Sequence, residues 1–123
     1  MGKLVKTYTA GGAIAHRRIV KFGAADGAVL QATAATEGLI GVTDHPGGAA
    51  SGERVDVVRS GFTEVEFGGT VTRGGYVTAD VDGKAVAAAP AAGTNNGVVG
   101  RAEVSAVAGD IALVFILPAQ VQG

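Results

Sequence analysis

Apolar and polar residues alternate over short runs along this chain, and glycine-containing turns separate one run from the next. In the run Phe62–Phe67, the apolar residues Val65 and Phe67 fall on one face. Glu64 and Glu66 fall on the other face, a pattern typical of a strand with one buried side in an antiparallel sheet. The same pattern predicts strands at Leu4–Thr9, Arg18–Phe22, Ala28–Ala32, Leu39–Thr43, Arg54–Arg59, Phe62–Phe67, Tyr76–Val81, Lys84–Ala88, Val98–Val107 and Ile111–Leu117.

Glycine-rich dipeptides supply the predicted connections between these strands. Asp26-Gly27 and Asp82-Gly83 are hairpin signals, because a type I′ turn needs positive φ at both central residues. Ser60-Gly61 is interpreted as a further turn, and Ala89–Gly97 is interpreted as a loop.

The pattern therefore predicts an all-β fold class. We expect a small compact barrel or sandwich of about 8–10 short, mostly antiparallel strands with Gly-rich turns. Residues 1–123 are predicted to form a single β-domain, because this length suits one domain and no linker is visible. Within it, residues 1–12 are interpreted as an extended N-terminal arm or as an edge strand.

The last apolar run, Ile111–Leu117, differs from the others because it is apolar on both faces. It is predicted either to be a central strand or to place one face in a subunit interface. Large side chains are otherwise scarce, since the chain has four Phe, two Tyr and no Trp. Some of these aromatic residues either anchor a subunit interface or fill the core. The candidates for self-association are Phe62, Phe67, Tyr76 and Phe115.

Charge is unevenly distributed, although the formal net charge is only −1. Residues 1–25 contain five bases and no acid, whereas the rest of the chain contains five bases and eleven acids. The small net charge does not favour nucleic-acid binding, and no direct nucleic-acid partner is predicted. The basic N-terminal segment is interpreted either as a surface that docks on an acidic partner or as a solvated strand face.

The sequence offers no convincing catalytic, metal or cofactor site, so an enzyme is not predicted. The absence of Cys excludes disulfides, thiolate zinc sites and a Cys nucleophile. His16 and His45 lack the spacing of metal ligands, and Glu64 with Glu66 is explained by a solvated strand face. No signal peptide is recognised, and no apolar run approaches the ~20 residues of a membrane helix, so no membrane partner is expected.

One lysine suggests a different class of protein. Lys84 follows the Asp82-Gly83 turn, an arrangement that looks a little like the hairpin of lipoyl or biotinyl carrier domains. In those domains the modified lysine sits at the tip of a tight turn. Here Asp82-Gly83 would form the tip, and Lys84 would begin the outgoing strand.

Characteristic segments stand in a set order along nearly the whole chain. They are Thr7–Gly12, Arg18–Gly23, Leu39–Asp44, Gly52–Val58, Ser60-Gly61, Glu64–Gly69, Asp82–Ala85, Gly97–Ala102 and Ala108–Asp110. In their order and spacing, these segments resemble the capsid decoration, or cement, protein family of tailed bacteriophages.

The resemblance implies a structural virion protein that binds the outer surface of the expanded phage head. Such a protein bridges major capsid protein subunits and stabilises the capsid lattice against the pressure of the packaged DNA. The resemblance also implies a homo-oligomer on the capsid, with a trimer favoured, made in the cytoplasm of the bacterial host. Modest affinity per contact becomes strong retention when several copies engage together.

On this interpretation, the basic N-terminal segment docks on the capsid, where it adds a strand to a capsid edge through main-chain hydrogen bonds. The capsid-contact candidates are Lys3, Leu4, Val5, Lys6, Arg17 and Arg18. The alternative within a phage particle is a tail-tube or head-completion subunit. The alternative from another class is the carrier barrel suggested by Lys84.

Overall fold

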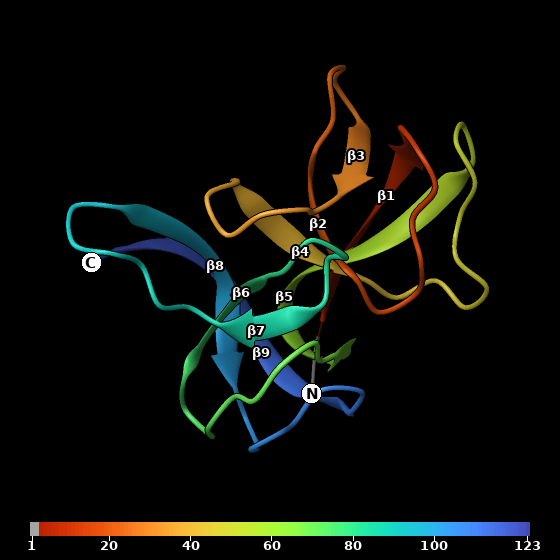
Figure 1. The fold of residues 1–123 in the computed structure, drawn as a ribbon. Coiled ribbons are helices and arrows are strands. Elements are labelled where there is room, and N and C mark those ends of the chain that lie inside the picture. Colours follow the sequence, from red (N-terminus) through yellow and green to blue (C-terminus); the bar gives the residue numbers. More distant parts are fainter. Residues whose placement is uncertain (1–2) are drawn as a thin grey trace.

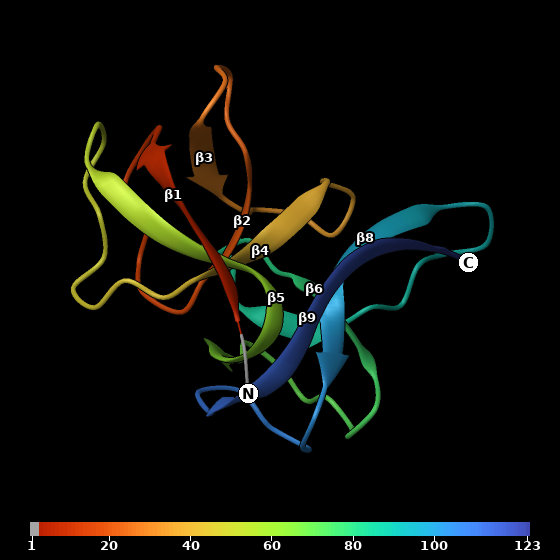
Figure 2. The ribbon, with the colours of Figure 1, turned by 180° about the vertical axis from the view of Figure 1, so that it is seen from behind.

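The computed structural model describes residues 3–123, and every regular element in this range is a strand. The nine strands of this range are β1 (Leu4–Ala10), β2 (Ile19–Phe22), β3 (Ala28–Gln31), β4 (Leu39–Thr43), β5 (Arg54–Glu66), β6 (Tyr76–Ala79), β7 (Ala85–Ala87), β8 (Asn95–Ala102) and β9 (Ile111–Gln122). The predicted all-β fold class is therefore confirmed. Figures 1 and 2 show the strands from the front and from behind.

The first five strands form a closed barrel. Their order is β1-β3-β2-β4-β5, and an additional antiparallel pairing of β1 with β5 closes the ring. Only the short β1–β3 pairing is parallel; β2 pairs with β3 and β4, and β4 pairs with β5, all antiparallel. Closure gives both main-chain edges of most strands a partner inside the barrel.

The remaining strands form an open sheet that shares β5 with the barrel. The order continues from β5 through β9, β8 and β6 to β7, which lies at the edge (Figure 1). The largest buried cluster joins the two halves: Phe67, Val114 and Ile116 of the sheet side pack with Ile19 and Val42 of the barrel. This cluster therefore forms a core between the barrel and the sheet, and a second cluster, which includes Val20 and Val55, fills the barrel.

The strand β5 overturns one prediction from the sequence. It runs without interruption through Ser60 and Gly61, so the predicted turn at Ser60-Gly61 is wrong. Gly61 has a φ of 100°, which an L side chain rarely adopts. Its pairing with Ile116 of β9 begins the ladder of the open sheet. Gly61 therefore bends a continuing strand from the barrel into the sheet.

The two predicted hairpins are confirmed, although their turns differ from the expected type. β2 pairs with β3 around Gly27, and β6 pairs with β7 around Gly83, both antiparallel. Gly27 has a φ of 78° and Gly83 has a φ of 72°, whereas the preceding Asp26 and Asp82 do not have positive φ. Neither turn is therefore type I′, which needs positive φ at both central residues.

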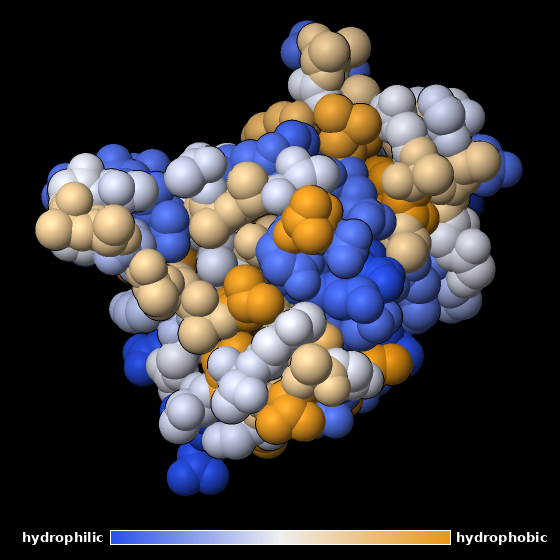
Figure 3. Space-filling view, viewed as in Figure 1, coloured by the Kyte–Doolittle hydropathy of each residue, from blue (hydrophilic) through white to orange (hydrophobic). Residues whose placement is uncertain are grey.

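The ends of β8 and β9 also differ from the prediction. β8 begins at Asn95 and ends at Ala102, and β9 continues to Gln122 rather than ending at Leu117. Asn95 lies opposite Gln122 in the ladder, so main-chain pairing extends both strands through polar residues of low strand propensity. The paired ends of β8 and β9 project from the body of the molecule. The β2–β3 turn and the loop before β5 also project, each in a different direction (Figures 1 and 3).

The N-terminal segment is largely built into the barrel. Of the predicted arm or edge strand at residues 1–12, residues 1 and 2 lie outside the described range, and Leu4–Ala10 is β1. β1 pairs with β5 from Leu4 to Thr9, but β3 joins its other side only at Thr9 and Ala10. The first half of β1 therefore has β5 on one side and no strand partner on the other among residues 3–123.

Candidate functional site

Three aromatic residues and one arginine form a row across the outer face of the open sheet. Phe62 of β5 lies opposite Phe115 of β9, Phe115 lies opposite Arg101 of β8, and Arg101 lies opposite Tyr76 of β6. The ring centroids of Phe62 and Phe115 are 5.0 Å apart, with their planes tilted by 52°. The Arg101 guanidinium carbon lies 5.1 Å from the centroid of the Tyr76 ring, within the range of a cation–π contact. We call Phe62, Phe115, Arg101 and Tyr76 the aromatic row.

The aromatic row borders a groove of about 390 Å³. Phe62 and Phe115 line it together with three charged residues, Arg73, Arg101 and Glu103. Arg101 is held in place because its Nε donates a hydrogen bond to the Gly74 carbonyl oxygen at 2.9 Å. Aromatic and arginine side chains of this kind are enriched at protein–protein contacts.

The outward side of β9 extends this apolar surface along the strand. Ile111, Phe115 and Leu117 are 47%, 36% and 61% exposed, and Leu113 between them is half-buried. The alternating residues Val114 and Ile116 are fully buried on the inner side. β9 is a central strand, with β5 and β8 on either side, and its outer face is apolar and uncovered. We call the outward residues Ile111, Leu113, Phe115 and Leu117 the β9 ridge.

The structure thus brings together three of the four predicted self-association residues. The fourth, Phe67, is fully buried and belongs to the core shared by the two halves. It forms no part of the outer surface because it lies on the inward side of the chain at the end of β5. Arg101, which joins the aromatic row through the register of β8, was missed by sequence reasoning.

Two of the predicted basic contacts lie beside the aromatic row. Lys3 pairs with Asp44 at 3.4 Å, and Arg17 pairs with Glu64 at 3.3 Å. Both pairs line a second pocket, of about 250 Å³, which also includes Phe62. Arg17 has a φ of 60°, an uncommon backbone conformation for a residue other than glycine. The basic and the aromatic candidates therefore meet at Phe62.

Three further contact candidates lie on the open half of β1. Leu4 and Val5 are 62% and 46% exposed, and Lys6 is also exposed. The main-chain N–H of Thr9 points to the β3 side of β1, where it donates to the Gly27 carbonyl at 2.8 Å. Since alternate residues of a strand point their main-chain groups the same way, Val5 directs its N–H toward the open side.

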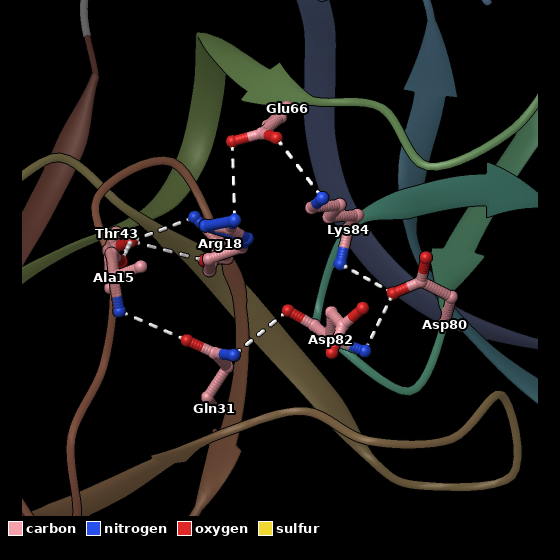
Figure 4. A network of polar contacts seen from close by, with 8 residues as sticks. All are labelled: Ala15, Arg18, Gln31, Thr43, Glu66, Asp80, Asp82 and Lys84. Carbon is pink, nitrogen blue, oxygen red and sulfur yellow. Dashed lines mark hydrogen bonds and ion pairs between the residues drawn. The ribbon is translucent and has the colours of Figure 1, made fainter. Parts of the chain in front are cut away.

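Arg18, the last basic candidate, is turned inward instead. Its side chain is only 15% exposed, and its Nη2 lies 3.3 Å from Glu66 Oε1. The other carboxylate oxygen of Glu66 lies 3.3 Å from Lys84 Nζ, so one carboxylate joins two cations (Figure 4). Arg18 comes from the barrel and Lys84 from the sheet half, and Glu66 therefore ties the two halves together.

The turn before Lys84 packs against the barrel. The main-chain N–H of Ile19 donates to the Gly83 carbonyl at 2.8 Å. Gln31 Nε2 donates to the Asp82 carbonyl at 2.9 Å, as Figure 4 shows. Hydrophilic side chains gather over this turn in the middle of the face in Figure 3. A carrier lysine must present a free tip to its modifying enzyme, but Lys84 is paired to Glu66 beside a packed turn. The geometry therefore does not match a carrier hairpin.

The two histidines are joined by a loop contact. The main-chain N–H of His45 donates to His16 Nδ1 at 3.0 Å. Burial, and then the neighbouring charge of Arg17, lower the pKa of His16 below its ordinary value. Within residues 3–123, no group of three His, Cys, Asp or Glu residues is arranged to hold a metal ion. No helix long and apolar enough to span a membrane occurs in the same range.

These features define an all-β protein in which a closed five-stranded barrel continues into an open sheet with an apolar outer face. No protein-family model matches the chain, and the search of curated proteins found no match. Among solved structures, the chain is similar to the N base of the head fiber protein gp8.5 of bacteriophage phi29. The likeness has a TM-score of 0.64 at 19% identity and covers 94% of this chain and 95% of the other. It establishes a shared fold over almost the whole length.

Proposed function

We propose that this chain is a structural protein of a bacteriophage head. It binds the outer surface of the expanded head as a homo-oligomer, and it bridges major capsid protein subunits so that the lattice is stabilised. The observation that carries the proposal is the fold shared, over almost the whole length, with the base of a phage head fiber. The segments that resemble the cement proteins point to the same particle.

The surface of the molecule supports a binding role. Large apolar side chains are exposed on the β9 ridge and on the first half of β1, where a purely solvated protein would gain nothing from them. The chemistry of a head protein is contact rather than catalysis. Repetition of one modest contact over many lattice sites then provides strong retention.

The capsid contact proposed here is the open side of β1. Leu4, Val5 and Lys6 are exposed there, and the main-chain groups facing that side have no strand partner within residues 3–123. An extended capsid segment would pair with this edge by main-chain hydrogen bonds, and Lys6 would meet an acidic group beside it. The capsid would provide the added strand and this protein the sheet edge, which is the reverse of the arrangement expected from the sequence, because β1 is held in the barrel by its pairing with β5.

Co-sedimentation with heads of the phage that lack this protein tests the proposed function. Purified protein is mixed with compact and with expanded heads in parallel. We expect saturable binding to expanded heads alone, with a copy number set by the lattice. Folded protein that binds neither form would contradict the proposal, and polymerisation of the protein alone would favour a tail-tube subunit.

Two variants at one position test the contact itself. Val5→Pro removes the outward N–H without removing a β1–β5 hydrogen bond, whereas Val5→Ala keeps that donor. We expect Val5→Pro to lose head binding at least about tenfold relative to Val5→Ala. Equal binding by the two folded variants would exclude strand addition at this edge.

A further inference from the structure

Two side chains of opposite charge, two residues apart in the sequence, lie on the outer face of the open sheet. Arg101 and Glu103 are both exposed and both line the groove with Phe62 and Phe115, while Ala102 between them is buried. Arg101 lies opposite Phe115, and the main-chain N–H of Glu103 donates to the Leu113 carbonyl at 3.0 Å. The face therefore carries an Arg101–Phe115 row next to a Glu103–Leu113 row.

Neither charge has an ion-pair partner in the part of the chain that the structure describes. Residues 3–123 form five ion pairs, and none of them includes Arg101 or Glu103. Both charges flank the β9 ridge, whose exposed apolar side chains lie on a central strand rather than at a loop tip. Arg73 lines the same groove, but only Arg101 and Glu103 lie directly opposite residues of the β9 ridge, namely Phe115 and Leu113. An apolar ridge with a positive and a negative side chain next to it in this way has the features of a self-complementary surface.

We propose that a second copy of this chain docks on this face, with its β9 antiparallel to the first. The two-fold axis lies in the plane of the interface and runs perpendicular to β9. It passes between the Arg101–Phe115 row and the Glu103–Leu113 row. Arg101 then faces Glu103 of the second copy, and Glu103 faces Arg101 of the second copy. Phe115 of each copy packs on Leu113 of the other, so the exposed part of the β9 ridge is covered.

The antiparallel orientation follows from the charges. A two-fold axis parallel to β9 would place Phe62 over Arg101 but would bring Glu64 against Glu103 of the second copy. Like charges placed opposite each other at an interface are strongly unfavourable, whereas the antiparallel arrangement pairs opposite charges twice. Tyr76 and the Gly74 carbonyl hold Arg101 in position, which reduces the entropy lost when the pair forms.

The inference rests on the homo-oligomer proposed above, for which it specifies a two-fold dimer in place of the trimer that the resemblance favours, but its test needs no phage head. Sedimentation equilibrium of the purified protein is measured for the wild type, Arg101→Glu, Glu103→Arg and the double variant. We expect a wild-type dimer that each single reversal weakens on the order of 100-fold, because both symmetry-related pairs become repulsive. The double variant exchanges the two charges and is expected to recover the wild-type affinity to within about tenfold.

Arg54→Glu, a reversal of an exposed arginine at the barrel end, is the control for an unspecific charge effect and is expected to leave the dimer intact. Circular dichroism checks the fold of each variant. Arg101→Glu also loses the hydrogen bond to the Gly74 carbonyl, which can disturb the fold of that variant. In that case the effect of Glu103→Arg on the dimer is the decisive result. A monomeric wild type, a trimer, or a dimer that Glu103→Arg leaves unchanged would each overturn the inference. Head binding is scored separately, so it can fail while the dimer stands.

Discussion

The closed barrel and the open sheet share the strand β5, but they differ in where their apolar side chains go. In the barrel, five strands surround a cluster that includes Val20, Val29 and Val55, and each of these is fully buried. In the sheet, β9 buries Val114 and Ile116 but also exposes apolar residues on its outer side. A closed ring has one interior, whereas an open antiparallel sheet has a second face that is left to solvent or to a partner.

With the proposed dimer, the side chains that stabilise the fold and those that make the contact between copies lie on opposite faces of one sheet. The inner face of the sheet contributes to the core shared with the barrel, and the outer face contributes the aromatic row and the β9 ridge. Polar outward residues would have sufficed for a monomer in water. The proposed dimer therefore gives the two sides of β9 different roles, and the following substitutions test this division.

The largest effect is expected from the buried phenylalanine. Phe67→Ala should lower the free energy of unfolding by about 3–5 kcal/mol, because it leaves a cavity where both halves meet. Phe115→Ala, on the outer face, should lower it by at most about 1 kcal/mol while weakening self-association at least about tenfold.

Urea unfolding measured at low protein concentration, with sedimentation in parallel, separates the two quantities. The comparison would fail if Phe115→Ala destabilised the monomer as much as Phe67→Ala does. It would also fail if Phe67→Ala left the unfolding midpoint unchanged.

The next effect concerns the ion pairs that join the two halves. Glu66→Gln should cost about 2 kcal/mol, because Arg18 would remain largely buried without its carboxylate and Lys84 would also lose its partner. Glu64→Gln is the matched control, since its partner Arg17 is more exposed, and it should cost less than about 1 kcal/mol. Equal losses in thermal unfolding would mean that Glu66 does not tie the barrel to the sheet.

The sequence predicted most strand positions because alternation is a local signal. It placed Val65 and Phe67 inward, and both are fully buried. It placed Glu64 and Glu66 on a solvated face, which is right for Glu64 but wrong for Glu66, because Glu66 is only partly exposed where it pairs with Arg18 and Lys84. It failed at Ser60-Gly61, because a serine-glycine pair is typical of turns. Pairing with β9, which lies far away in the sequence, keeps the strand continuous there.

The site was predictable only in part for a related reason. The apolar outward face of Ile111–Leu117 was visible in the sequence, and Phe62 and Tyr76 were recognised as candidates. Arg101 was missed because its place depends on the register of β8 with β9 and β6. A signal existed, since Arg101 stands alone between Gly100 and Ala102, but only the register makes it a neighbour of aromatic rings.

A smaller effect is expected where β5 passes from barrel to sheet. Gly61→Ala should cost about 1–2 kcal/mol, because a Cβ is unfavourable at a φ of 100°. Ser60→Ala changes the neighbouring side chain without this backbone constraint and serves as the control. If denaturant unfolding shows the two variants to be equally stable, the bend does not depend on glycine at this position.

The last effect is a pH dependence at a barrel loop that touches the sheet. Burial alone would raise the pKa of Glu37, but hydrogen bonds from Lys21, Thr33 and the N–H of Ala34 outweigh it and hold the pKa below its ordinary value of 4.5. The loop is linked to β8, because the Gly97 N–H donates to the Ala35 carbonyl at 2.8 Å. A carboxylate whose pKa is lower in the folded state stabilises the protein above its unfolded pKa, and this contribution is lost as the pH falls through the folded pKa.

Thermal unfolding of the wild type and of Glu37→Gln, followed from about pH 6 to about pH 3, tests this dependence. We expect the variant to be less stable than the wild type at the upper end, and the two curves to converge as Glu37 becomes protonated. Asp26→Asn removes one exposed negative charge at the β2–β3 turn, away from the loop and from the proposed dimer face, and should run parallel to the wild type. Parallel curves for Glu37→Gln as well would mean that the hydrogen-bonded carboxylate does not stabilise the contact between barrel and sheet.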